Sequence, residues 1–270
     1  MPRSVDLSGC WAKLDHAKQH IDALRHEIER AGAPDPGYIP LLRQYEPDEG
    51  AVVYRIGRVT QIRDHWPLIV GDAVHDLRSA LDHLMWQLAI VYLGRQPKKT
   101  EARDIQFPEV QRLRDFNRHR FLKYVLPADV NRLKPFQPYK RTKRGELHPL
   151  PKLVRLSNID KHRKLHLLVV IPQSASFTNR PDAFRDCVPC PTTSGPQGQP
   201  AAIIEHIAPG RAPRAGDLIF RIPVRPTGTN PDVVLDARII GYVGLGRIGP
   251  VIPMLDATAL YVSNVLGAFQ

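Results

Sequence analysis

The sequence has few cysteines and no long apolar run. Three cysteines, Cys10, Cys187 and Cys190, are too few to cross-link 270 residues, and their odd number leaves one unpaired within the chain. This usage argues against a disulfide-rich extracellular scaffold and predicts a reducing, cytoplasmic location. No window approaches the roughly 18 to 20 apolar residues of a membrane span, and the first residues hold no apolar signal core, so neither membrane insertion nor export is expected.

Acidic residues are also scarce, most of all in the middle of the chain. The net charge is +11, and residues 111–144 hold eleven basic residues against two acidic ones, a net +9. Aromatic residues interleave with these charges, and phosphate attraction combined with flat rings for bases is typical of nucleic-acid binding. The segment predicts RNA binding, with DNA as a second ligand; a solvated basic face over core aromatics is the alternative. The expected phosphate contacts are Arg118, Arg120, Lys123, Lys140, Arg141, Lys143 and Arg144.

The spacing of apolar residues predicts an α+β fold. Helical periodicity covers residues 7–31 and the long stretch from Pro67 to Gly94, and β-rich runs around a turn at residues 47–50 predict an inserted hairpin. Further helices are expected at 111–124, 129–133, 150–164 and 252–269, and antiparallel strands at 165–177, 201–207, 217–224 and 233–243. We expect a helical region with the hairpin and basic segment over 1–164, and a β-rich region with a closing helix over 165–270. Whether the two pack as one domain stays open.

The helix expected from Pro67 to Gly94 has one polar and one apolar face when its residues are placed 100° apart. Arg78 and Asp82 are four residues apart and can pair directly. One interpretation is a buried salt-bridge network that fixes helix packing. A metal site is another, but no established spacing such as His-Glu-x-x-His is present, so no metal or cofactor is expected. The polar candidates are His75, Asp76, Arg78, Ser79, Asp82 and His83.

The six residues from Arg78 to His83 resemble the Arg-x4-6-His motif of the HEPN superfamily, helical domains that include metal-independent RNases and defence or toxin proteins. The resemblance covers the helices around residues 7–94. In catalytic members the ribose 2′-hydroxyl attacks the adjacent phosphate. The resemblance implies His83 as the acid–base group and Arg78 as the group that stabilises the phosphorane charge, with Asp82 and His75 beside them.

A second pair of segments, GDAVHDLRSALDHLMWQL and LSNIDKHRKL, is similar to segments that occur together in uncharacterised bacterial proteins. The pair spans about residues 67–171 and implies no function. The polar residues of the downstream segment are expected to anchor the long helix or to complete its site. The expected supporting residues are Ser79, Asp160, His162 and Arg163.

The sequence therefore predicts a protein that acts on nucleic acid, in its sharpest form a metal-independent endoribonuclease of defence or toxin type. A non-catalytic binding or scaffold protein with a structural polar network on the central helix is the alternative. A homodimer is expected because Trp86, Ile90 and Leu93 continue beyond the polar stripe and offer apolar surface to a second copy. Cys187 and Cys190 form one Cys-x-x-Cys without a second pair, so a zinc site there is not expected.

Overall fold

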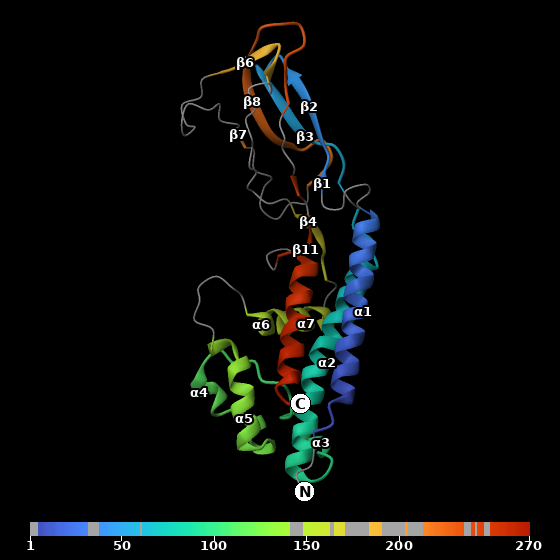
Figure 1. Cartoon of the computed structure of the whole chain (residues 1–270), viewed down its shortest axis with the longest axis vertical. Coiled ribbons are helices and arrows are strands. Elements are labelled where there is room, and N and C mark those ends of the chain that lie inside the picture. Colours follow the sequence, from blue (N-terminus) through green and yellow to red (C-terminus); the bar gives the residue numbers. More distant parts are fainter. Residues whose placement is uncertain are drawn as a thin grey trace. The chain divides into compact units, whose positions relative to one another are not determined.

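The structure is a computed structural model. It describes residues 5–31, 38–59, 61–140, 148–162, 165–170, 184–190, 203–204, 213–234, 239–240, 242–245 and 249–270. These residues form a mixed helix-and-sheet, α+β fold, as expected (Figure 1). The chain divides into two compact units: Met1–Glu27, Arg63–Leu167 and Arg247–Gln270 form the first, and Ile28–Ile62 with Leu168–Gly246 form the second.

The first unit is helical and is built around α2 (Trp66–Leu93). Pro67 lies in the first turn of this helix, and Gly94 ends it in the left-handed conformation with φ 68°, so both ends follow the rule of proline at the start and glycine at the stop. The fully buried face of α2 includes Val74, Leu77 and Leu81. Two further helices, α6 (Pro149–His162) and α7 (Val251–Gly267), pack against this helix.

Helix α1 (Ser8–Ala31) runs antiparallel to α2 within this unit. Its start lies beside the C-terminal half of α2, since a Cβ at Gly9 would be 3.8 Å from His83 Nδ1. Farther along α1, Glu27 Oε2 accepts a hydrogen bond of 2.8 Å from Trp66 Nε1, at the first residue of α2. Both long helices of the sequence analysis are thus confirmed, and polar contacts join them along their length.

The basic segment folds into short helices, as expected, and two of them share the range 111–124. The helices are α4 (Leu113–Phe116), η1 (Arg120–Tyr124), α5 (Pro127–Leu133), η2 (Lys134–Phe136) and η3 (Pro138–Lys140), preceded by α3 (Lys99–Ala102). Phe116 and Phe121 are fully buried and meet edge to face with ring centroids 5.4 Å apart, and Tyr139 lies against Phe116. The aromatic rings therefore form the core of the segment. Of the two alternatives for these rings, the core position is confirmed, so the two phenylalanines do not present flat surfaces to bases.

The second unit contains a five-stranded antiparallel sheet in the order β2-β3-β8-β6, with β7 also paired to β8. Its strands are β2 (Leu41–Glu46), β3 (Ala51–Ile56), β6 (Cys187–Pro189), β7 (Ile203–Ile204) and β8 (Leu218–Pro226). The expected hairpin is confirmed, with Glu46 opposite Ala51. Tyr54 stacks on Phe220 at 4.4 Å between ring centroids, in the apolar core that β3 and β8 share.

Three short strand pairs complete the described part of this unit. They are β1 (Tyr38–Ile39) with β10 (Ile239–Ile240), β4 (Leu168–Val170) with β11 (Tyr242–Gly244), and β5 (Phe184–Arg185) with β9 (Asp232–Val233). The strand expected at 233–243 is divided among β9, β10 and β11, and residues 235–238 and 241 lie outside the described residues. The expected strands at 165–177 and 201–207 likewise include residues outside the described part of the chain.

The two units differ from the expected division at residues 164 and 165. The hairpin belongs to the sheet unit because β3 is a central strand whose second edge pairs with β8. The closing helix α7 belongs to the helical unit because its buried side chains, among them Leu255 and Val262, pack against α2 and α6. Among the described helices, none has both the length and the apolar character required to cross a bilayer.

Candidate functional site

Arg78 and Asp82 form an ion pair on α2, with 3.0 Å between Arg78 Nη2 and Asp82 Oδ1. Both residues of the pair also form hydrogen bonds with the backbone of Phe107. Arg78 Nη2 donates to the Phe107 carbonyl at 3.1 Å, and the Phe107 N–H donates to Asp82 Oδ1 at 2.8 Å. The Arg78 side chain is only 15% exposed. This clamp fastens the segment that leads into the basic residues onto α2.

His83 lies on a different side of α2 from Arg78. The two residues are five positions apart, which corresponds to about 140° around a helix. His83 is exposed and lies near Gly9 at the start of α1, whereas Arg78 turns toward Phe107. His75 is also exposed, and its Nε2 lies 3.4 Å from the Ser79 hydroxyl one turn along the helix. One copy of the chain therefore does not bring the expected catalytic pair together.

Asp76 belongs to a polar cluster with α1 that the sequence analysis missed. Lys13 Nζ lies 2.7 Å from Asp76 Oδ1, and His16 Nδ1 lies 2.5 Å from Asp76 Oδ2. Burial opposes ionisation of Asp76, but the hydrogen bonds from Lys13 and His16 hold its pKa below the usual range. His20 joins the cluster, with its ring centroid 4.5 Å from that of His16. The signal was the spacing Lys13, His16, His20, which puts all three on one face of a helix.

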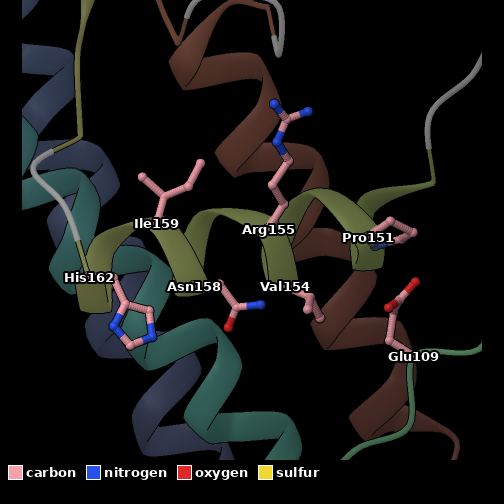
Figure 2. A pocket seen from close by; sticks show the side chains of 7 residues that line it. All are labelled: Glu109, Pro151, Val154, Arg155, Asn158, Ile159 and His162. Carbon is pink, nitrogen blue, oxygen red and sulfur yellow. The ribbon is translucent and has the colours of Figure 1, made fainter.

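Of the expected supporting residues on α6, Asp160 lies against the long helix α2. A Cβ at Gly71 would be 2.5 Å from Asp160 Oδ1, so this glycine makes room for Asp160 where α6 meets α2. His162 is one of the residues that line an open hollow of about 640 Å³ along α6. Figure 2 shows His162, Asn158 and Val154 on one side of α6 and Arg155 on the opposite side. Arg163 lies outside the described residues.

The basic segment presents its cations to solvent. The exposed ones in its described part are Arg112, Arg114, Arg118, Arg120, Lys123, Arg132 and Lys140. Some have an acidic neighbour near the outer limit of ion-pair distance. Arg120 Nη1, on a side chain that is 78% exposed, lies 3.6 Å from Asp104 Oδ1. Arg141, Lys143 and Arg144 lie outside the described residues. The segment is thus a folded cationic surface over an aromatic core.

No family model matches this chain, and neither a curated protein nor a solved structure shows significant similarity to it. Its function is therefore inferred from its own residues.

Proposed function

We propose that this protein binds nucleic acid, RNA foremost, by contacting the phosphate backbone with the cationic surface, defined as the exposed basic residues of 112–140. The observation that supports this most is the concentration of exposed positive charge in one folded segment. Residues 111–140 hold eight basic and two acidic residues, with the arginines outside and Phe116 and Phe121 inside. Cations contact phosphates without reading sequence, so binding of this kind is electrostatic and tolerant of base sequence.

The clamp on α2 has a defined part in this proposal. Phe107, which Arg78 and Asp82 hold, is 2% exposed and precedes the cationic surface by five residues. At the other end of the segment, the Tyr261 hydroxyl of α7 donates to the Phe136 carbonyl at 2.8 Å. Fixed ends keep the exposed cations in a constant arrangement, which lowers the entropy cost of binding a polyanion. Arg78 and Asp82 act here as positioning residues.

A second candidate function is the metal-independent endoribonuclease of defence or toxin type that the HEPN-like motif implies. It is favoured by the exposure of His83 and His75, which leaves two imidazoles on α2 free to meet solvent or substrate. Because Arg78 and His83 lie about 140° apart on one helix, this function needs a homodimer in which residues of two copies face one cleft. It also requires that Arg78 release the Phe107 carbonyl and bind a phosphate of the RNA instead.

Binding is tested by fluorescence anisotropy with RNA and DNA oligonucleotides over a range of salt concentrations. The triple variant Arg118→Gln, Arg120→Gln and Lys123→Gln removes three exposed cations. The slope of log K against log salt should flatten by about 0.7 to 0.9 for each lost phosphate contact. Oligonucleotides of different sequence should bind with similar affinity.

A control with the same loss of charge separates this surface from net charge. Lys18→Gln, Arg155→Gln and Lys161→Gln remove three cations from α1 and α6. This control should keep the slope of the parent chain. Equal slopes for the parent and the first triple variant would remove the cationic surface from the proposal.

A further inference from the structure

A cluster of two histidines and one aspartate lies between α1 and α2, apart from the cationic surface. His16 and His20 are one turn apart on α1, and Asp76 comes from α2. One ring nitrogen of each histidine and one Asp76 oxygen all lie within 4.8 Å of one another. We propose that these three side chains bind a divalent transition-metal ion, Zn²⁺ in the first place. This site departs from the expectation that the protein uses no metal, and it does not rest on the proposed function.

The donor set indicates the class of ion. Two imidazole nitrogens and one carboxylate oxygen suit Zn²⁺ and its neighbours, whereas Mg²⁺ and Ca²⁺ prefer oxygen ligands throughout. Histidines four residues apart on a helix place both rings on one side, which is the arrangement that helical zinc motifs use. The sequence from His16 to His20 has this spacing, and α2 supplies the third ligand from a neighbouring helix.

The two oxygens of Asp76 have separate partners. Lys13 Nζ binds Oδ1 at 2.7 Å, so Oδ2 faces His16 Nδ1 at 2.5 Å. A metal would take the place of the proton in this short hydrogen bond. Metal–ligand distances of about 2.0 to 2.2 Å separate tetrahedral donors by about 3.3 to 3.6 Å. This separation is larger than the present 2.5 Å between His16 and Asp76 and lies inside the 4.8 Å within which all three donor atoms are found. Small rotations of the two histidines therefore suffice.

The site is open on one side. Asp76 is buried, with 5% of its side chain exposed, whereas the His16 side chain is 57% exposed. A buried carboxylate that cannot swing away and two histidines that can adjust form a partly preorganised set of ligands. A three-ligand site of this kind keeps a coordination position for water or for an anion, as catalytic zinc sites do. A metal would also join α1 to α2.

Isothermal titration of the tag-free, chelator-treated full chain with Zn²⁺ tests the proposal. The titrated chain carries Cys190→Ser, because Cys190 is a half-exposed thiol that competes for zinc. We expect one ion per chain. His16→Ala and His20→Ala should each weaken binding at least about 100-fold, because loss of a residue that only orients a ligand already costs about 10- to 100-fold.

His75→Ala is the matched control, since His75 is an exposed histidine of α2 outside the cluster. It should bind Zn²⁺ like the parent chain. The two α1 variants change exposed or half-exposed side chains, so circular dichroism should show an unchanged fold. Zn²⁺ should raise the Tm of the parent and of His75→Ala, but not of His16→Ala or His20→Ala.

Three results would overturn the proposal. The parent chain could fail to bind Zn²⁺, the His16→Ala and His20→Ala variants could bind Zn²⁺ as tightly as the parent chain does, or His75→Ala alone could lose binding. The cluster would then only tie α1 to α2 as an ion-pair network. The cationic-surface triple variant should bind Zn²⁺ normally, so failure of the nucleic-acid proposal and failure of the metal proposal are distinguishable.

Discussion

Arg78 and His83, the two residues of the candidate motif, differ in exposure and in the groups that they contact. Arg78 is a mostly buried cation whose charge is balanced by Asp82 and whose donors reach the Phe107 backbone. His83, five residues later, is exposed near the start of α1. The residue types alone made both candidates for chemistry, but in the structure Arg78 contacts Asp82 and Phe107, whereas His83 is exposed.

The first prediction concerns the clamp. Asp82→Ala leaves the Arg78 cation and the Phe107 N–H without their acceptor. Because Arg78 is mostly buried and Asp82 partly exposed, the free energy of unfolding should fall by about 2 to 3 kcal/mol, between the limits for exposed and buried pairs. Denaturant unfolding measures this loss. Asp115→Ala, which breaks the exposed pair with Arg114, is the control and should change stability by under about 1 kcal/mol. Equal effects of the two substitutions would contradict the clamp.

The second prediction concerns thiol reactivity. Cys10 is 1% exposed, and burial raises the pKa of its thiol to about 11. Since the thiolate is the reactive form, Cys10 in the folded chain should resist iodoacetamide at neutral pH, whereas half-exposed Cys190 should be modified first. Mass spectrometry of peptides reports the order of labelling. In denaturant all three cysteines should react at similar rates, and early labelling of Cys10 without denaturant would mean that α1 opens.

At the scale of elements, polar contacts hold α1 against α2 at both ends of their contact. Near the end of α1, Glu27 Oε2 accepts hydrogen bonds from Trp66 Nε1 at 2.8 Å and from His65 Nε2 at 2.6 Å. These bonds stabilise the ionised carboxyl, and the one from Trp66 contributes most to lowering the Glu27 pKa below its ordinary value near 4.5. The start of α2 is thereby tied to a charge on α1.

The third prediction gives the pH dependence of this contact. A carboxyl whose pKa is lower in the folded chain stabilises the fold above the unfolded pKa, and the contribution is lost as pH falls through the folded pKa. Glu27→Gln keeps an acceptor for Trp66 but removes the charge. The stability difference between parent and variant should therefore be constant near neutral pH and shrink below about pH 4.5. Chemical unfolding at several pH values measures it. A difference that grows on acidification has the wrong sign and would reject the assignment.

At the scale of the whole molecule, the chain leaves and re-enters its helical unit. Residues 28–62 belong to the sheet unit and include two strands of its sheet, and the chain then returns to the helical unit with residues 63–167. The last segment of the helical unit includes the closing helix α7. The helical unit contains both the cationic surface and the metal-site candidate, as well as Arg78 and His83. Functional tests therefore use the full chain, because three separate segments contribute to one core.

The fourth prediction tests the second candidate function. If two copies form the endoribonuclease, the full chain cleaves total RNA in the presence of EDTA, leaves 2′,3′-cyclic phosphate or 3′-phosphate ends, and has the mass of a dimer by light scattering. His83→Ala should abolish this cleavage without altering stability or mass, since His83 is exposed. Arg78→Ala is less decisive because it also releases Phe107.

His166→Ala is the control for this test, since His166 is another exposed histidine of the helical unit. It should cleave at the rate of the parent chain. Cleavage that survives His83→Ala, or that disappears with EDTA and returns with a divalent metal, would reject the metal-independent mechanism.

The sequence by itself determined what depends on local spacing and composition. Periodicity and the signals at Pro67 and Gly94 placed the long helix, and β-rich runs around the turn at residues 47–50 placed the hairpin. A spacing of four predicted the Arg78–Asp82 pair. The positive charge of the basic segment also follows directly from its composition. Whether its aromatic rings face solvent or the core stayed open, because composition does not distinguish an exposed phenylalanine from a core one.

Only the tertiary structure decided which distant residues share a neighbourhood. Neither spacing nor charge predicts that Arg78 holds Phe107, or that Asp76 meets His16 across 60 residues of chain. Such pairs depend on the crossing of packed helices, which is set by the sum of many apolar contacts over the whole core. For the same reason, only the tertiary structure shows that β3 of the hairpin pairs with β8, about 165 residues away. Without β8, the backbone N–H and C=O groups on that edge of β3 would be unpaired.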